Sequence, residues 1–193
     1  LDSKVGNGNW MCWLTADHGA ATPPSLARSV GMPVDYWKPG NMIEDVKADL
    51  KSEYGDEQWI LSYSNDQFFF NRPLMRERGI DLDEAQRRIQ LLCQQYEGVS
   101  MVITGRDLTS GNTAGDPIVE KIRNGWSANT SGDVIVVIQP GWIKYGLAGT
   151  THGSPFPYDT HVPCIFYGWH VPKGITYERT YIQDIAPTVA ALI

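Results

Sequence analysis

The stretch Asn9-Trp10-Met11-Cys12-Trp13-Leu14-Thr15-Ala16-Asp17-His18-Gly19-Ala20 indicates the fold class of this chain. Its first part, Trp10–Leu14, is a short run of bulky apolar residues, the pattern of a strand buried on both faces. The run is followed by a carboxylate, an imidazole and a glycine, at Asp17, His18 and Gly19. In open α/β sheets the chemistry lies just beyond the carboxyl ends of such strands. We therefore expect an α/β fold with a candidate site at Asp17 and His18.

The Asp17-His18 pair has the chemistry of a metal site. Carboxylate oxygen and imidazole nitrogen are both zinc ligands, so adjacent Asp17 and His18 could serve one cation. The alternative is a loop in which Asp17 caps a turn and His18 is solvated. The dipeptide alone does not decide between these two interpretations.

The composition limits the classes of function. A chain of 193 residues with 42% hydrophobic and 20% charged residues is typical of a folded globular protein. The net charge of -6 gives no electrostatic footprint for a nucleic-acid polymer. No apolar run approaches the roughly 18 residues of a membrane span. The chain opens at Leu1 without Met and closes on the apolar segment 185–193 with no helix stop signal, so we expect a piece of a longer protein.

The pattern of apolar residues changes at residue 41, and the segment 41–108 is predicted to form a separate α+β unit. Met42, Val46 and Leu50 recur at helical spacing. Two strand-like runs, 59–63 and 67–71, flank a hairpin signal at 64–66. A second helix over 81–96, with Asp81 as its expected N-cap, and a strand over 99–104 follow. This succession predicts a compact α+β insert of ferredoxin-like character at 41–108.

The remaining segments, 1–40 and 109–193, are predicted to form a core with a parallel sheet. The run Val134–Ile138 is as apolar as Trp10–Leu14, and Cys164–Gly168 is a further buried strand. We expect Val134–Ile138 to lie in the same sheet as Trp10–Leu14.

A second group of polar residues precedes the Cys164 strand. The loop Thr150–Pro163 contains two histidines and an aspartate, His152, Asp159 and His161. His161 lies where the loop enters the strand, a position that holds a side chain firmly. A loop histidine taken by itself is more often solvated than a ligand.

Together, the two stretches resemble the alkaline phosphatase superfamily. The motifs are Thr-Ala-Asp-His-Gly-Ala at 15–20 and His-Gly-Ser-x-x-x-Tyr-Asp-Thr-His-Val-Pro at 152–163. The bacterial single-chain alkaline phosphatases, grouped with type I phosphodiesterases and nucleotide pyrophosphatases, are the most similar branch. The resemblance covers essentially the whole chain, and only the C-terminal portion of the family's longer sequence. It implies an alkaline-phosphatase-like core, of which this chain forms a part.

The resemblance also implies a metal-dependent reaction. Members hold two zinc ions (Zn2+) that carry a phosphoryl group between them. Asp17 and His18 match ligands of the metal that also binds the nucleophile, and His161 matches a ligand of the other metal. His152 and Asp159 are candidates for a second shell, in which Asp159 orients His161. The alternative for Asp159 is that it caps the loop.

Several parts of such an enzyme have no match in residues 1–193. The family's Thr or Ser nucleophile, its phosphate-binding residues and its other ligands come from upstream of Leu1. We therefore expect the missing N-terminal half of the same protein as a partner, a small phosphate ester as substrate, and little activity in the isolated chain. The choice between monoesters and diesters stays open. The resemblance further implies a periplasmic or extracellular location.

A reading of a different class is a non-catalytic α/β binding or scaffold module, a degenerate relative of the enzymes. In that case the aromatic insert would dock a partner through residues such as Trp59, Tyr63 and Phe68–Phe70. Aromatic residues at alternating positions are more often part of a core than of an interface. For the enzyme, the same insert is either a roof over the site or an inert structural cap.

Overall fold

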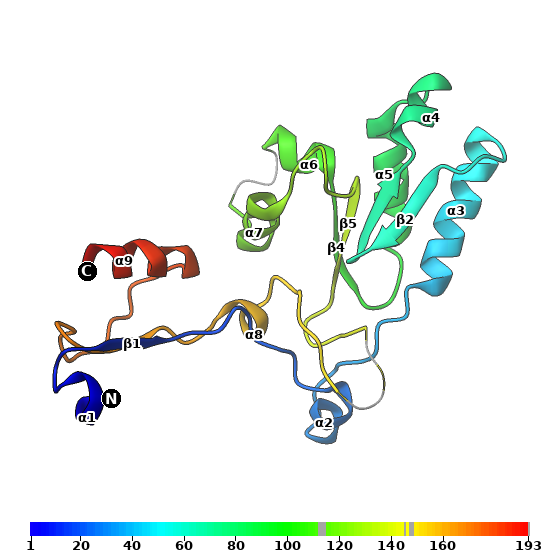
Figure 1. Cartoon of the computed structure of the whole chain (residues 1–193). Coiled ribbons are helices and arrows are strands. Elements are labelled where there is room, and N and C mark those ends of the chain that lie inside the picture. Colours follow the sequence, from blue (N-terminus) through cyan, green and yellow to red (C-terminus); the bar gives the residue numbers. More distant parts are fainter. Residues whose placement is uncertain (112–114, 145, 147–148, 193) are drawn as a thin grey trace. The chain divides into compact units, whose positions relative to one another are not determined.

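The computed structural model describes residues 1–111, 115–144, 146 and 149–192, and its elements form a mixed α/β fold (Figure 1). The chain divides into two compact units. One combines Leu1–Gly19 with Thr160–Ile193, and the other is Ala20–Asp159. The α/β class predicted from the sequence is confirmed.

The unit formed by the two ends of the chain is built on a two-stranded ribbon. Strand β1 (Met11–Leu14) pairs antiparallel with β6 (Ile165–Gly168). The sequence predicts both runs as buried strands, and this is wrong for the ribbon, because a two-stranded ribbon leaves the side chains of Trp13, Leu14, Ile165 and Tyr167 exposed. The short helices α1 (Asp2–Val5) and η1 (Ile182–Asp184) and the helix α9 (Ile185–Leu192) complete the unit. Rings of Trp10 and Tyr167 lie 5.6 Å apart across the ribbon.

The larger unit is organised on a four-stranded antiparallel sheet with the strand order β2-β3-β5-β4. Its elements are α2 (Pro24–Ser29), α3 (Gly40–Tyr54), β2 (Ile60–Ser64), β3 (Gln67–Phe70), α4 (Arg72–Glu77), α5 (Leu82–Cys93), β4 (Val99–Thr104), α6 (Gly105–Ser110), α7 (Pro117–Gly125) and β5 (Val134–Ile138). The short helix α8 (Pro157–Thr160) lies at its end.

Helices cover both faces of this sheet, with α3 and α5 on one side and α6 and α7 on the other (Figure 1). The central strand β5 is buried on both faces: Val134 and Val136 pack with α3 and α5, while Ile135 and Val137 pack with α6 and α7. Along the chain, helix α3, the hairpin β2–β3, helix α5 and strand β4 come first. Strand β5 comes last and lies between β3 and β4 in the sheet. The ferredoxin-like character expected of this region is therefore present, and its last central strand, β5, comes from beyond residue 108.

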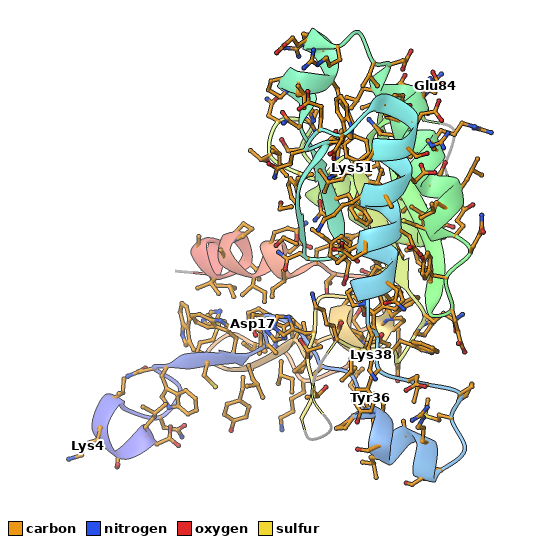
Figure 2. All side chains as sticks on the ribbon, turned by 90° about the vertical axis from the view of Figure 1, so that its right-hand side faces the viewer. Lys4, Asp17, Tyr36, Lys38, Lys51 and Glu84 are labelled. Atoms are coloured by element: carbon orange, nitrogen blue, oxygen red, sulfur yellow. The ribbon has the colours of Figure 1, made fainter. Side chains whose placement is uncertain are left out.

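Two local predictions agree closely with the structure. The stripe Met42, Val46 and Leu50 is the buried face of α3, while Lys51, labelled in Figure 2, forms an ion pair with Asp56. Asp81 caps α5, because its carboxylate accepts the backbone N–H groups of the second and third helical residues at 2.8 and 3.1 Å.

The placement of Val134–Ile138 in the sheet of Trp10–Leu14 is wrong. As β5, this run pairs with β3 and β4 in the four-stranded sheet. The apolar pattern identifies a strand buried on both faces, but it carries no information on which strands are its neighbours. In the described ranges every pairing within the two sheets is antiparallel, so the parallel strands expected of the core are not formed there.

The division into an insert at 41–108 and a core at 1–40 and 109–193 stays a prediction. The four-stranded sheet takes β2, β3 and β4 from the predicted insert and β5 from beyond it. Within the described residues, no helix combines the length and the apolar character that crossing a membrane requires.

Candidate metal centre

The ribbon places two of the predicted ligand segments at one of its ends. Its register runs from Met11 opposite Gly168 to Leu14 opposite Ile165. Asp17 and His18 follow β1 at this second end, and His161 precedes β6 at the same end. Antiparallel pairing therefore brings together, at one end, segments that are more than 140 residues apart in the sequence.

The imidazole ring of His18 is held by a contact with the neighbouring backbone. Its Nδ1 lies 2.7 Å from the carbonyl oxygen of Gly19. A carbonyl only accepts hydrogen bonds, so this contact places a proton on Nδ1. Such a backbone contact is a common way to fix the tautomer of a metal-binding histidine.

The Asp17 carboxylate lies close to the same ring. Its Oδ2 is 3.6 Å from His18 Nε2, and its Oδ1 accepts the His18 backbone N–H at 3.1 Å. The side chain is 88% exposed, and it lies in the segment after β1 (Figure 2). Both contacts are with the adjacent residue, whereas a carboxylate that caps a turn accepts the N–H two residues on. The metal-binding role of Asp17 stays a prediction.

The described residues do not by themselves complete a metal site. His161 is exposed, and no group of three or more His, Cys, Asp or Glu side chains in the described ranges is close enough to hold a metal ion. A catalytic zinc ion takes three protein ligands and an open position. This chain brings Asp17 and His18 together, and it places His161 at the same end of the ribbon without joining it to them in such a group.

The two predicted second-shell residues belong to the larger unit. His152 is exposed, whereas Asp159 is buried, with 5% of its surface exposed. Asp159 Oδ2 accepts the backbone N–H of Ser154 at 2.7 Å, which closes the loop just before His161. This contact is the loop cap that the sequence left as an alternative, and the orienting role of Asp159 stays a prediction.

The sequence did not reveal a pocket of about 630 Å³ within the larger unit. Its lining comes from separate segments, including 65–67, 121–126, 135–138, 142–144 and 151–159. No local spacing signals such a pocket, because only the packing of the sheet and its flanking loops brings these segments together.

No protein-family model matches the chain. Three curated proteins are similar to all of it. Alkaline phosphatase PafA of Elizabethkingia meningoseptica is 30% identical over 194 residues, which are 35% of its own length. Alkaline phosphatase PhoV of Synechococcus elongatus is 35% identical over 197 residues, 34% of its length. A calcium-transporting ATPase of Myroides odoratus is 32% identical over 197 residues, 35% of its length.

The fold agrees with the sequence comparison. The crystal structure of wild-type alkaline phosphatase PafA matches this chain with a TM-score of 0.87 and 30% sequence identity, covering 100% of this chain and 36% of that one. The chain thus spans about a third of the length of the curated relatives that it matches. The chain is therefore similar in sequence and in fold, over its whole length, to about a third of PafA, which fits a C-terminal portion of a protein of the alkaline phosphatase superfamily.

Proposed function

We propose that the protein containing this chain is a zinc-dependent phosphate-ester hydrolase. The observation that carries the proposal is the ribbon register, which brings the Asp17-His18 segment and His161 to the same end of β1 and β6. The full-length similarity of the chain to two alkaline phosphatases supports it.

The three candidate ligands fit zinc chemically. Asp17 offers an exposed carboxylate, and His18 and His161 offer imidazole nitrogens, and both kinds of group are zinc ligands. In this proposal Asp17 and His18 hold one of two metal ions and His161 contributes to the other. A pair of zinc ions, when bound, stabilises the attacking and leaving oxygens of an in-line phosphoryl transfer.

The other contacts of the chain would position these ligands. The His18–Gly19 hydrogen bond fixes the orientation of the imidazole ring. The Asp159–Ser154 hydrogen bond holds the loop that leads into His161, and Asp159 is thereby a positioning residue. His152 belongs to the same loop and is proposed to take part in the second shell.

The remaining parts would come from the rest of the protein. A pair of zinc ions needs about six protein ligands, and this chain offers three candidates. We propose that the other ligands, the Thr or Ser nucleophile and the phosphate-binding residues lie upstream, in the N-terminal part of the same protein. The proposed substrates are small phosphate esters, either monoesters or diesters, and the proposed location is the periplasm or the cell exterior.

The test is zinc analysis of the full-length protein together with hydrolysis of a generic phosphomonoester and phosphodiester. We expect two zinc ions per chain, and loss of zinc and of turnover in both Asp17→Ala and His161→Ala. His170→Asn is the matched control, because His170 has a backbone φ of 56° that asparagine tolerates and lies outside the candidate ligands. Absence of both zinc and turnover in the wild-type protein would instead support the non-catalytic binding module.

A further inference from the structure

The larger unit is inserted into the unit that carries the candidate metal ligands. The chain enters it after Gly19 and leaves it after Asp159. Asp17 and His18 lie just before the first crossing, and His161 lies just after the second. A shift of either crossing segment is therefore passed along a few covalent bonds to a candidate ligand.

The two crossing segments are hydrogen-bonded to each other inside the larger unit. The backbone N–H of Ala21 donates to the carbonyl oxygen of Thr151 at 3.1 Å. In the other direction, the hydroxyl group of Thr150 donates to the carbonyl oxygen of Ala21. Ala21 is buried, with 4% of its surface exposed, and a hydrogen bond shielded from water is stronger than one in solvent. We refer to Ala21, Thr150 and Thr151 as the clamp.

The loop between the clamp and His161 is also held to the body of the larger unit. Lys121 of α7 donates its Nζ to the carbonyl oxygen of Pro155 at 2.8 Å. The next residue, Phe156, is buried in the apolar cluster formed with α6 and α7. The carboxylate of Asp159 then accepts a backbone N–H of the same loop. The segment that leads to His161 therefore has several fixed points, and the clamp is the one that joins it to the other crossing.

We propose that the clamp fixes the spacing between the segment that carries Asp17 and His18 and the segment that carries His161. Thr150 is a positioning residue in this arrangement, because its side chain makes one of the two bonds. Ligands that are held in place before the ion arrives bind it more tightly, since less ordering is required on binding. The inference rests on the proposed zinc site, and it gives the larger unit a role other than a roof or an inert cap.

The experiment measures the zinc affinity of the full-length protein, by titration of the metal-free protein in competition with a chromogenic chelator. Thr150→Val keeps the shape of the side chain and removes the hydroxyl group. We expect the dissociation constant for zinc to rise about threefold to tenfold in this variant. Thr150→Ser keeps the hydroxyl group and should bind zinc as the wild type does.

Hydrogen exchange of the Ala21 amide reports the clamp without zinc and without turnover. Its N–H is bonded to Thr151, so we expect its protection in the metal-free protein to fall in Thr150→Val and to be retained in Thr150→Ser. Thermal unfolding of the same variants separates this role from a merely structural one. A residue that only stabilises the larger unit would lower the unfolding temperature and leave the zinc affinity of the folded protein unchanged.

Thr109→Val is the matched control. The Thr109 hydroxyl also bonds to backbone carbonyl oxygens, at 3.2 Å to Gly105 and 3.0 Å to Arg106, but these bonds lie within the single helix α6. This variant should keep the wild-type zinc affinity and the protection of the Ala21 amide.

Two results would overturn the inference and leave the proposed function in place. One is a folded Thr150→Val variant that binds zinc with wild-type affinity, and the other is a Thr150→Ser variant that binds zinc as weakly as Thr150→Val. A wild-type protein that binds no zinc would overturn the proposed function, and this inference with it. The wild-type titration therefore distinguishes the two failures.

Discussion

Arg72, which is partly exposed, forms an ion pair with the buried carboxylate of Asp133, with Arg72 Nε 2.7 Å from Asp133 Oδ1. The other oxygen of Asp133 accepts the backbone N–H of Phe70 at 2.8 Å. The guanidinium group also donates to the carbonyl oxygens of Ala128 and Ser131. This cluster ties the end of β3 and the start of α4 to the residue before β5, and so holds the two central strands of the larger unit together.

Removing the carboxylate should therefore destabilise the larger unit strongly. Asp133→Ala leaves the Arg72 guanidinium and the Phe70 N–H without their partner, and we expect the free energy of unfolding to fall by about 3–5 kcal/mol. The control is Glu57→Ala, because Glu57 pairs with Arg78 at 2.7 Å where both side chains are exposed to solvent. That change should cost at most about 1 kcal/mol in a urea titration. Equal losses in both variants would contradict the assignment.

The same carboxyl group should make stability depend on pH. Burial raises the pKa of Asp133 above its ordinary value of 3.8, and the Phe70 N–H and Arg72 partly oppose this shift. Between the ordinary and the raised pKa the folded state binds more protons than the unfolded state, so the free energy of unfolding falls as pH rises through this window. The stability of wild type relative to Asp133→Asn should decrease over that range. A constant difference would contradict the raised pKa, and Arg72→Met should raise the pKa further.

The sequence predicts local elements well, because their signals lie in neighbouring residues. The stripe of α3, the cap at Asp81, the hairpin turn at Asn65 and Asp66, and the strand Val99–Thr104 all follow from spacing or turn chemistry. Asn65 and Asp66 both adopt positive φ, as a two-residue hairpin turn requires. The neighbours of Val134–Ile138 could not be predicted, because strand pairing is decided by residues that are far apart in the chain.

The candidate site shows the same division. Residue types and motif resemblance single out Asp17, His18 and His161, and the ribbon register then places their segments at one end. The sequence could not indicate that His18 Nδ1 would be held by Gly19, or that Ala21 would pair with Thr151. These features depend on backbone geometry and packing rather than on spacing.

The end of the ribbon depends on a glycine. Gly168 has a φ of 113°, and a Cβ there would lie 2.3 Å from the backbone oxygen of Trp10. Gly168→Ala should therefore distort the β1–β6 pairing and lower the free energy of unfolding of the full-length protein by at least about 1–3 kcal/mol. Gly174→Ala is the control, because a Cβ at Gly174 would meet nothing within 4 Å. Wild-type stability in Gly168→Ala would mean that the close approach to Trp10 is absent in solution.

The isolated 193-residue chain should bind zinc weakly and hydrolyse phosphate esters little or not at all. The reason is that its described residues contain no group of three or more candidate ligands close enough for a metal ion. Equilibrium dialysis with zinc, followed by turnover of a phosphomonoester and a phosphodiester, measures both properties. Turnover by the purified chain that is abolished in Asp17→Ala would contradict this prediction.

The β1–β6 ribbon should be the least protected part of the isolated chain in hydrogen exchange. A two-stranded ribbon is marginally stable in water, and this one exposes half or more of several apolar side chains, namely Leu14 at 59%, Ile165 at 53% and Tyr167 at 63%. Strand β5, in contrast, is buried on both faces of its sheet. Amides of β5 should therefore exchange much more slowly than those of β1 and β6.

The full-length protein provides the comparison. Large exposed apolar side chains on a ribbon indicate a covering surface, and we propose that the rest of the same protein supplies it, as the coverage of only about a third of each relative suggests. Protection of Cys12 and Tyr167 amides, which form a hydrogen-bonded pair of the ribbon, should then rise by orders of magnitude in the full-length protein, while that of β5 changes little. If β1 and β6 exchange equally fast in both forms, the ribbon is not covered by the rest of the protein. If the ribbon amides are as strongly protected in the isolated chain as in the full-length protein, the ribbon is stable by itself. Its pairing then needs no surface that covers the exposed apolar side chains.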